Sequence, residues 1–398
     1  MQTKTTMAKP HFIIKNNFQK GGLYQDLLIP SILSDVCLKV TDREDYTCDF
    51  DNAGYNVGRL AILKYQGKNT YISFSEVEIR SRNSSFQSFP SALSRFILDE
   101  NPNKEVCFYF HPSITGNFET PYFIFMYRLM KTAKVNFLNG NEYLNQSIFP
   151  FSTPADIIVH KDNMRNTNSG NRSTYITRAA NDNLQIFGKT YGANKYETTI
   201  LCLAISEIAI TKVELYEIEE GGLTKLPQNA KEAIESLGVI QIFTSNRTIE
   251  RTNFEENDSL RSIEYIYNLL EKLGNKKCAF CECEISQIIQ GAHIWPVAEI
   301  KKESSLTQDE KLALSLDGDN GLWLCQNHHK LLDVNFLRVS EDGSIKYRKE
   351  INETASDFIQ DITINNQLPN EIITDKFLHY LSKRNESIQE EFYSELAC

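Results

Sequence analysis

The sequence predicts an α+β protein with a mixed, strand-rich N-terminal region and a small C-terminal module held together by metal. Two observations lead to this prediction. Short apolar or alternating runs bounded by turn residues, typical of strands, dominate the first 150 residues. After residue 274, cysteines and histidines come in pairs at the spacing of zinc ligands. A chain of 398 residues is long enough for two or three domains with cores of their own.

The composition is that of a soluble globular protein, with 41% hydrophobic and 24% charged residues. No apolar run approaches the roughly 20 residues needed to span a bilayer. The first ten residues lack the apolar core of a signal peptide, so we expect a cytoplasmic protein without a membrane partner. A net charge of −10 argues against a nonspecific nucleic-acid coating protein. It does not exclude an enzyme with a locally basic cleft.

Strands and helices alternate along the N-terminal region. Two apolar runs around a Gly-Lys-Asn turn predict a hairpin, and a polar, turn-rich stretch at 161–173 predicts an exposed loop. Residues 122–135 are apolar throughout, and periodicity does not decide between strand and helix. The predicted strands are 57–65, 70–80, 105–111, 184–188 and 212–218, and the predicted helices are 86–98 and 194–208.

The remaining segments surround the metal-ligand pairs. Residues 244–257 are polar and predict a linker. A helix is expected at 259–273, with Gly274 as its stop. Beyond the pairs, residues 343–349 predict a strand, and 371–396 predict one or two amphipathic helices.

Two ligand pairs predict a structural Zn²⁺ site. Cys278 and Cys281 form one pair, Cys325 and His328 form the other, and each pair has two residues between its members. Four such ligands suit tetrahedral zinc. Cys283 is an alternative ligand whose spacing fits less well. The other cysteines are scattered without a disulfide-like framework, so we expect them to be reduced.

A histidine, an asparagine and a second histidine complete the pattern. His293 lies in an apolar Gly-Ala-His-Ile-Trp-Pro run, Asn320 precedes Cys325 by five residues, and His329 follows His328. Together with the zinc ligands, this order resembles the HNH family of ββα-metal endonucleases over residues 278–336. The resemblance implies a two-stranded ribbon, covered by a helix, that holds one catalytic divalent metal.

The resemblance also implies a role for each residue. His293 corresponds to the general base that activates water, and Asn320 to the asparagine that orients that histidine and its loop. His329 corresponds to a ligand of the catalytic Mg²⁺ or Mn²⁺, which in this family stabilises charge on the leaving 3′-oxygen.

The sequence departs from the common family pattern at Ala292, where many members have a second metal ligand. Asp333 is the candidate replacement, because it would share a helical face with His329 if 327–333 is a helix. Asp317 and Asp319 are alternatives that could equally be loop carboxylates. Two tryptophans, at 295 and 323, are expected to pack the small core.

These observations predict a metal-dependent DNA endonuclease, most simply a site-specific restriction or defence enzyme. One alternative is a nonspecific defence nuclease gated by an activator or a modified base, and another is an inactive zinc-binding DNA module. Since each chain has one site, we expect a homodimer on double-stranded DNA. The expected domains are 1–243 (recognition or sensing, with a possible division near 150), 244–274 (linker and helix), 275–340 (nuclease) and 341–398 (tail).

The residues that contact bases are unknown. Polar candidates are Arg80, Arg82, Asn83 and Arg172, chosen from composition alone.

Overall fold

The computed structural model describes residues 8–16, 28–52, 60–144, 148–164, 174–190, 192–219, 226–257 and 262–396. It confirms the mixed α+β class, and it brings three cysteines and a histidine of the C-terminal region into one cluster. The chain divides into two compact units, each described by itself. The N-terminal unit comprises 1–174, 189–215 and 221–242, and the C-terminal unit comprises 175–188, 216–220 and 243–398.

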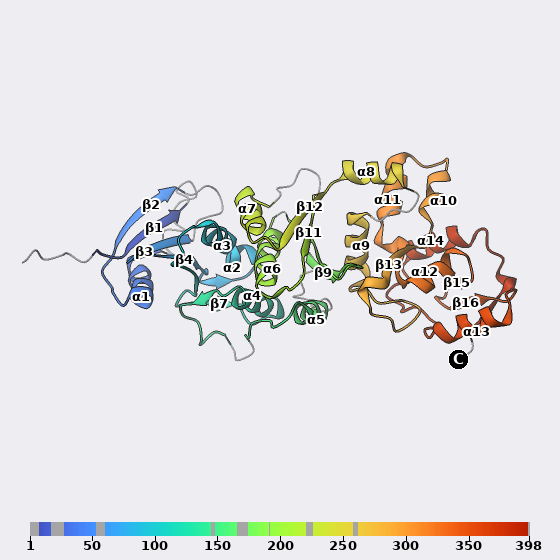
Figure 1. Cartoon of the computed structure of the whole chain (residues 1–398), viewed down its shortest axis with the longest axis horizontal. Helices are drawn as coiled ribbons and strands as arrows, with labels where there is room; N and C mark the ends of the chain where they lie inside the picture. The colour runs from blue at the N-terminus through green and yellow to red at the C-terminus, as the bar shows by residue number, and fades with distance from the viewer. Residues whose placement is uncertain are drawn as a thin grey trace, which may run out of the picture. The chain divides into compact units, whose positions relative to one another are not determined.

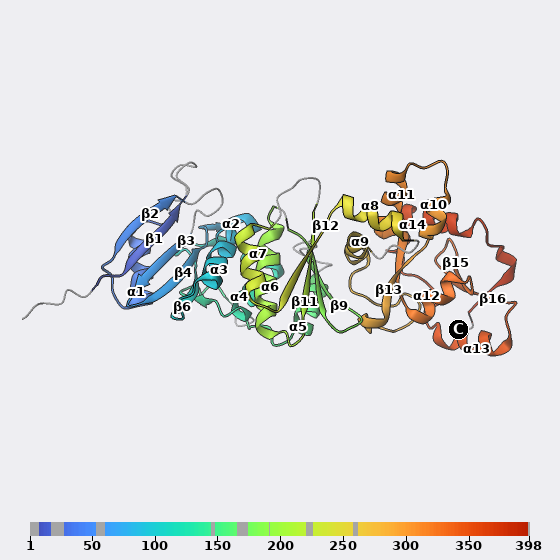
Figure 2. The ribbon, with the colours of Figure 1, turned by 45° about the horizontal axis from the view of Figure 1, so that its top comes forward.

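The described residues of the N-terminal unit include a six-stranded sheet in the order β2-β1-β3-β4-β6-β8. Figures 1 and 2 show β1, β2, β3 and β4 side by side in this sheet. The predicted hairpin is confirmed: β3 and β4 pair antiparallel around a turn at Gln66 and Gly67, which both have positive φ. Alternating apolar residues such as Leu63 and Ile72 bury one face beneath α1. The strands are β1 (His11–Asn16), β2 (Thr47–Asn52), β3 (Leu60–Tyr65), β4 (Lys68–Phe74), β6 (Lys104–Tyr109) and β8 (Asn136–Phe137), with a separate β5 (Glu78–Ile79) and β7 (Thr115–Gly116) pair.

Helices are more prominent in this unit than the sequence predicted. The undecided segment 122–135 is the helix α4, which begins with Pro121 in its first turn and buries side chains on most of its surface. The helix predicted at 194–208 is confirmed as α6. The predicted loop at 161–173 begins inside α5, and its remainder, with Arg172, lies outside the described residues. The helices are α1 (Pro30–Thr41), α2 (Arg82–Phe86), α3 (Phe89–Leu98), α4 (Pro121–Thr132), α5 (Pro154–Met164), α6 (Asn194–Ile208) and α7 (Gln228–Ser236).

A four-stranded sheet in the order β12-β11-β10-β9 precedes the C-terminal module. The segment predicted as a linker, 244–257, instead contains helix α8. Asn246 caps this helix by accepting hydrogen bonds from two backbone amides, and the helix buries its own residues Glu250 and Phe254. Because most of its residues are polar, the sequence pattern did not indicate that one face of this segment is buried. The elements are β9 (Thr174–Arg178), β10 (Leu184–Lys189), β11 (Val213–Ile218), β12 (Ile240–Ser245) and α8 (Arg247–Glu256).

The module itself is an antiparallel ribbon of β13 and β14, with helix α12 directly after β14. Helix α9 begins at a Ser262 cap, ends at Gly274 and covers the other side of the ribbon. Both tryptophans are buried, as predicted. The bounds are α9 (Ile263–Leu273), η3 (Ser286–Ile288), β13 (Ile289–His293), α10 (Val297–Lys302), α11 (Gln308–Leu316), η4 (Gly318–Asn320), β14 (Gly321–Cys325) and α12 (Gln326–Asp333).

The tail folds back onto the module instead of extending from it. The strand predicted at 343–349 is confirmed as β16, and one tail helix is confirmed as α14, but residues 393–395 form a strand of a three-stranded sheet instead of continuing a helix. Among the described residues, no helix has the length and apolar character to cross a membrane. The tail elements are β15 (Leu337–Val339), β16 (Ile345–Arg348), α13 (Glu353–Ile362), α14 (Asp375–Asn385), η5 (Glu390–Phe392) and β17 (Tyr393–Glu395).

Candidate metal centres and active site

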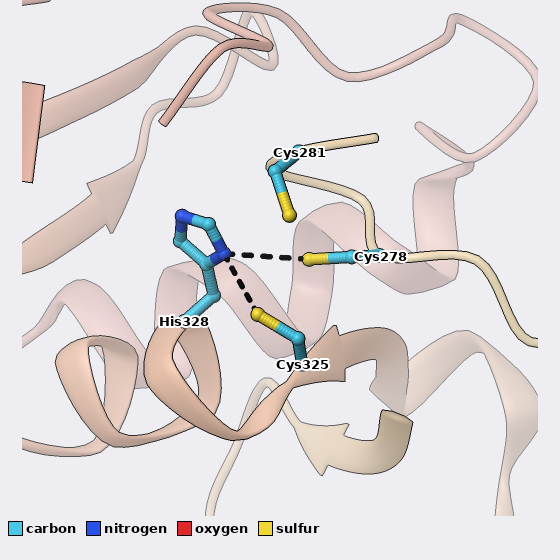
Figure 3. Close-up of side chains that lie close together, drawn as sticks. All are labelled: Cys278, Cys281, Cys325 and His328. Carbon is cyan, nitrogen blue, oxygen red and sulfur yellow. Dashed lines mark hydrogen bonds between the residues drawn. The ribbon is translucent and has the colours of Figure 1, made fainter. Parts of the chain in front are cut away.

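The four residues with zinc-ligand spacing converge on one point (Figure 3). Cys278 and Cys281 come from the loop after α9, Cys325 ends β14, and His328 lies in the first turn of α12. Their ligand atoms all lie within 4.8 Å of one another. Metal bonds of roughly 2.1–2.3 Å in a tetrahedron would separate ligand atoms by roughly 3.4–3.8 Å, so this set of donors fits a zinc ion.

The hydrogen bonds of His328 orient its lone pair into this cluster. The hydroxyl of Thr363 donates to the carbonyl of Ile359, so it accepts from His328 Nε2 at 3.2 Å. Nδ1 is then unprotonated, and it lies 3.2 Å from the sulfur of Cys325 and 3.5 Å from that of Cys278. Burial lowers the pKa of His328 to about 4, which keeps the imidazole in its neutral, ligating form.

Cys283, the alternative ligand, has a backbone role instead. Its carbonyl accepts a hydrogen bond from the backbone amide of Cys278 at 2.9 Å, which closes the turn that carries the first ligand pair. Its sulfur is not among the clustered ligand atoms.

His293 lies at the end of β13, and its hydrogen bond to a backbone carbonyl decides which of its ring nitrogens can accept a proton. Nε2 lies 2.9 Å from the carbonyl oxygen of Ser315, and a carbonyl only accepts, so Nε2 carries the hydrogen. Nδ1 therefore holds the free lone pair. The ring stacks on Tyr265, with centroids 4.1 Å apart and planes 9° from parallel. Desolvation is the main cause that lowers the pKa of His293 to about 4; the hydrogen bond to the Ser315 carbonyl opposes this shift, and the nearby His329 adds to it.

Asn320 is fully buried, and its side chain fixes the chain that follows His293. Its Oδ1 accepts from the amide of Trp295 at 2.7 Å. Its Nδ2 donates to the carbonyls of Trp295 and Leu314, each at 3.2 Å. Because Leu314 immediately precedes Ser315, one carboxamide holds both the strand that carries His293 and the segment that binds its Nε2.

His329 and Asp333 lie one turn apart on α12, with Nε2 and Oδ2 separated by 3.7 Å. This distance is short enough for both atoms to bind one divalent cation at roughly 2.1 Å each. Ala292 is buried, and its methyl side chain offers no ligand atom. It lies on the face of the ribbon opposite to that of Gly291, which faces α9.

The alternative carboxylates are already engaged by other groups. Asp319 accepts from Lys272 and Thr374, each at 2.6 Å. Asp317 accepts from Lys376 at 3.1 Å and from the hydroxyl of Tyr380 at 3.0 Å. They therefore join the loop before β14 to α9 and to the tail.

Arg384 on α14 is a residue that sequence reasoning missed. Its guanidinium donates to the carbonyl of Ile294 at 3.2 Å, to the carbonyl of Leu332, and to Asn335 Oδ1 at 3.0 Å. It thereby ties the residue after His293 to the residue before Asp333. These partners lie 90 and 52 residues away in the chain, and no local pattern marks such a contact.

A two-stranded ribbon followed by a helix, with a histidine at the end of the first strand and a cysteine–histidine cluster beside it, is the arrangement expected of a ββα-metal nuclease module. Residues 278–337 match the family model of HNH endonucleases (HNH_2), which confirms the resemblance over this segment. The chain therefore carries an HNH endonuclease domain. No curated protein matches the chain in a sequence comparison.

We expect Cys325→Ser to lose zinc, because an alcohol replaces one of four thiolate or imidazole ligands. Elemental analysis of purified protein should give one zinc per chain for the unaltered protein and much less for the variant. Cys283→Ser is the matched control and should keep its zinc. Full zinc retention in Cys325→Ser would contradict the assigned cluster.

We expect His293 to titrate below pH 5 and to carry its proton on Nε2. Since the folded-state pKa of about 4 lies below the usual histidine value of 6.5, the imidazole is neutral at pH 7 and protonates only in acid. Nitrogen-15 NMR of histidine-labelled protein measures both properties, with the His293→Ala spectrum assigning the signal. A midpoint near 6.5, or a proton on Nδ1, would show that the described packing is wrong.

Proposed function

We propose that this protein is a metal-dependent DNA endonuclease that hydrolyses phosphodiester bonds, with His293 as general base, and that it acts as a site-specific restriction or defence enzyme. The observation that carries the proposal is the unprotonated Nδ1 of His293, in a segment that matches HNH endonucleases and that also holds the His329–Asp333 pair. His329 is near enough to His293 to lower its pKa.

In this proposal, Nδ1 of His293 takes a proton from the attacking water. The Ser315 carbonyl then stabilises the imidazolium by accepting the Nε2–H hydrogen bond. Asn320 fixes the backbone on either side of the ring through its bonds to Trp295 and Leu314. A Mg²⁺ or Mn²⁺ ion held by His329 and Asp333 would supply Lewis-acid stabilisation of charge on the phosphate and the leaving oxygen. Zinc held by the clustered cysteines and histidine would be structural.

A restriction-type role is supported by chain organisation. A large N-terminal unit with its own sheet and core precedes the nuclease module and is available for recognition. Cutting both strands of double-stranded DNA with one site per chain requires two chains or two successive events. We therefore propose that the protein acts as a homodimer on DNA.

The test is cleavage of unmethylated and modified plasmid DNA by zinc-loaded protein with Mg²⁺ or Mn²⁺. We expect discrete fragments, and a rate at least about 100-fold lower for His293→Ala, because general-base catalysis contributes roughly 10²–10⁴-fold. His11→Ala in the N-terminal unit is the control histidine and should cut normally.

Two other outcomes of this cleavage test would favour one of the alternative functions. An unspecific smear would replace site-specific cleavage with a nonspecific, gated nuclease. Zinc-loaded protein that cuts no DNA would indicate an inactive binding module. In that case, Ala292→Asp tests whether a missing metal ligand is the cause. A carboxylate at the position where many HNH family members have a ligand should restore cleavage only if the metal site is the defect.

A further inference from the structure

A cavity of about 290 Å³ lies within the C-terminal unit, apart from the zinc cluster and from the His329–Asp333 pair. Its walls come from β10 and β11, from the first turns of α9, and from the ribbon beside Gly291. Sites for small organic ligands usually span roughly 300–1,000 Å³, so this volume suits one ring system with a short substituent.

One wall of the cavity is aromatic. Phe187 and Tyr216 stack with centroids 4.8 Å apart and planes 17° from parallel, and Tyr216 stacks in turn on Phe243 at 5.2 Å. Trp323 contributes a further ring. Rigid aromatic walls of this kind accept flat rings, face-on or edge-on, at little entropic cost.

The cavity also has a cationic side chain and several amides. The ammonium of Lys276 lies over the ring of Trp323, 5.7 Å from its centroid, and makes one long hydrogen bond, 3.4 Å, to the carbonyl of Arg178. Within the described part of the chain, no carboxylate pairs with it. A lysine has three donors, so it can bind an anionic group of a ligand. Gln185, Gln287 and Gln290 also line the cavity. The Nε2 of Gln287 donates to Asp182 at 2.7 Å and that of Gln185 to the hydroxyl of Tyr216 at 3.3 Å, and amide side chains of this type can also bind the edges of bases.

We propose that this cavity binds a single nucleotide, with its base against the aromatic wall and its phosphate on Lys276. The nucleotide is either free in solution or an extrahelical nucleotide of bound DNA, since both present the same base and phosphate. The DNA source rests on the proposed nuclease function, whereas binding to the cavity is measured without cleavage.

Tyr265 connects the cavity to the catalytic residues. It lines the cavity, its ring stacks on His293, and its hydroxyl donates to the backbone carbonyl of Asn320 at 3.3 Å. Gly291 also lines the cavity, and a side chain there would collide with Leu269. An occupant therefore touches the residue that packs against the general base, so occupancy would change the rate of cleavage.

The test uses full-length, zinc-loaded protein carrying His293→Ala, to prevent cutting, and Trp295→Phe, which leaves Trp323 as the single tryptophan. The probes are dAMP, dGMP, dCMP and TMP, followed by a duplex containing 2-aminopurine. Saturable quenching of Trp323 fluorescence by a mononucleotide identifies the free source. A rise in 2-aminopurine emission on duplex binding, without mononucleotide binding, identifies the extrahelical source.

Lys276→Met and Lys277→Met form a matched pair. Lys277 is exposed and pairs with Glu284 at 2.9 Å, outside the cavity lining. We expect Lys276→Met to weaken the response at least about ten-fold, as for loss of a hydrogen bond to a charged group, and Lys277→Met to leave it unchanged. Zinc content checks that each variant is folded, and Tyr216→Leu replaces Lys276→Met if that variant loses zinc.

Absence of both responses, or equal weakening by the two lysine variants, overturns the proposal. A protein that cuts DNA yet shows neither response refutes the cavity alone, whereas one that binds nucleotides but cuts nothing refutes the nuclease assignment alone.

Discussion

The hydrogen bonds of the buried Asn320 carboxamide are the constraint on which the candidate site depends. Both its oxygen and its nitrogen are satisfied by backbone groups, two on Trp295 and one on Leu314. Leaving one such buried group without a partner would cost about 1–3 kcal/mol. The end of β13 and the segment before η4 are therefore held at one separation, and that separation places the Ser315 carbonyl at His293.

A small ribbon and one helix could not maintain this geometry unaided, because so short a module buries little apolar surface. Two additions support it. The cysteine–histidine cluster joins the loop after α9 to the start of α12, and Thr363 from the tail orients its histidine. Arg384, also from the tail, bridges β13 and α12 from the other side. The tail thus belongs to the site, although it lies beyond the segment that matches the family.

Features that depend on residues close together in the sequence could be predicted, whereas contacts between distant residues could not. Ligand pairs, the helix carrying His329 and Asp333, and the helix at 194–208 are set by local spacing, and the structure contains each of them. Segment 122–135 could not be decided, because a helix buried on most sides loses its periodicity. Helix α8 was missed, because its polar composition hides one buried apolar residue, Phe254. Contacts such as that of Arg384 join residues far apart in sequence, and no local signal reports them.

In the proposed reaction, water activated at His293 attacks the phosphorus and expels the 3′-oxygen. The most direct test is single-turnover cleavage in water enriched in oxygen-18, followed by mass spectrometry of the DNA ends. We expect 3′-hydroxyl ends and one oxygen-18 atom on each 5′-phosphate, with product formed at least about 100-fold more slowly by His293→Ala. Ends carrying 3′-phosphate, or labelled product formed equally well by His293→Ala, would contradict it.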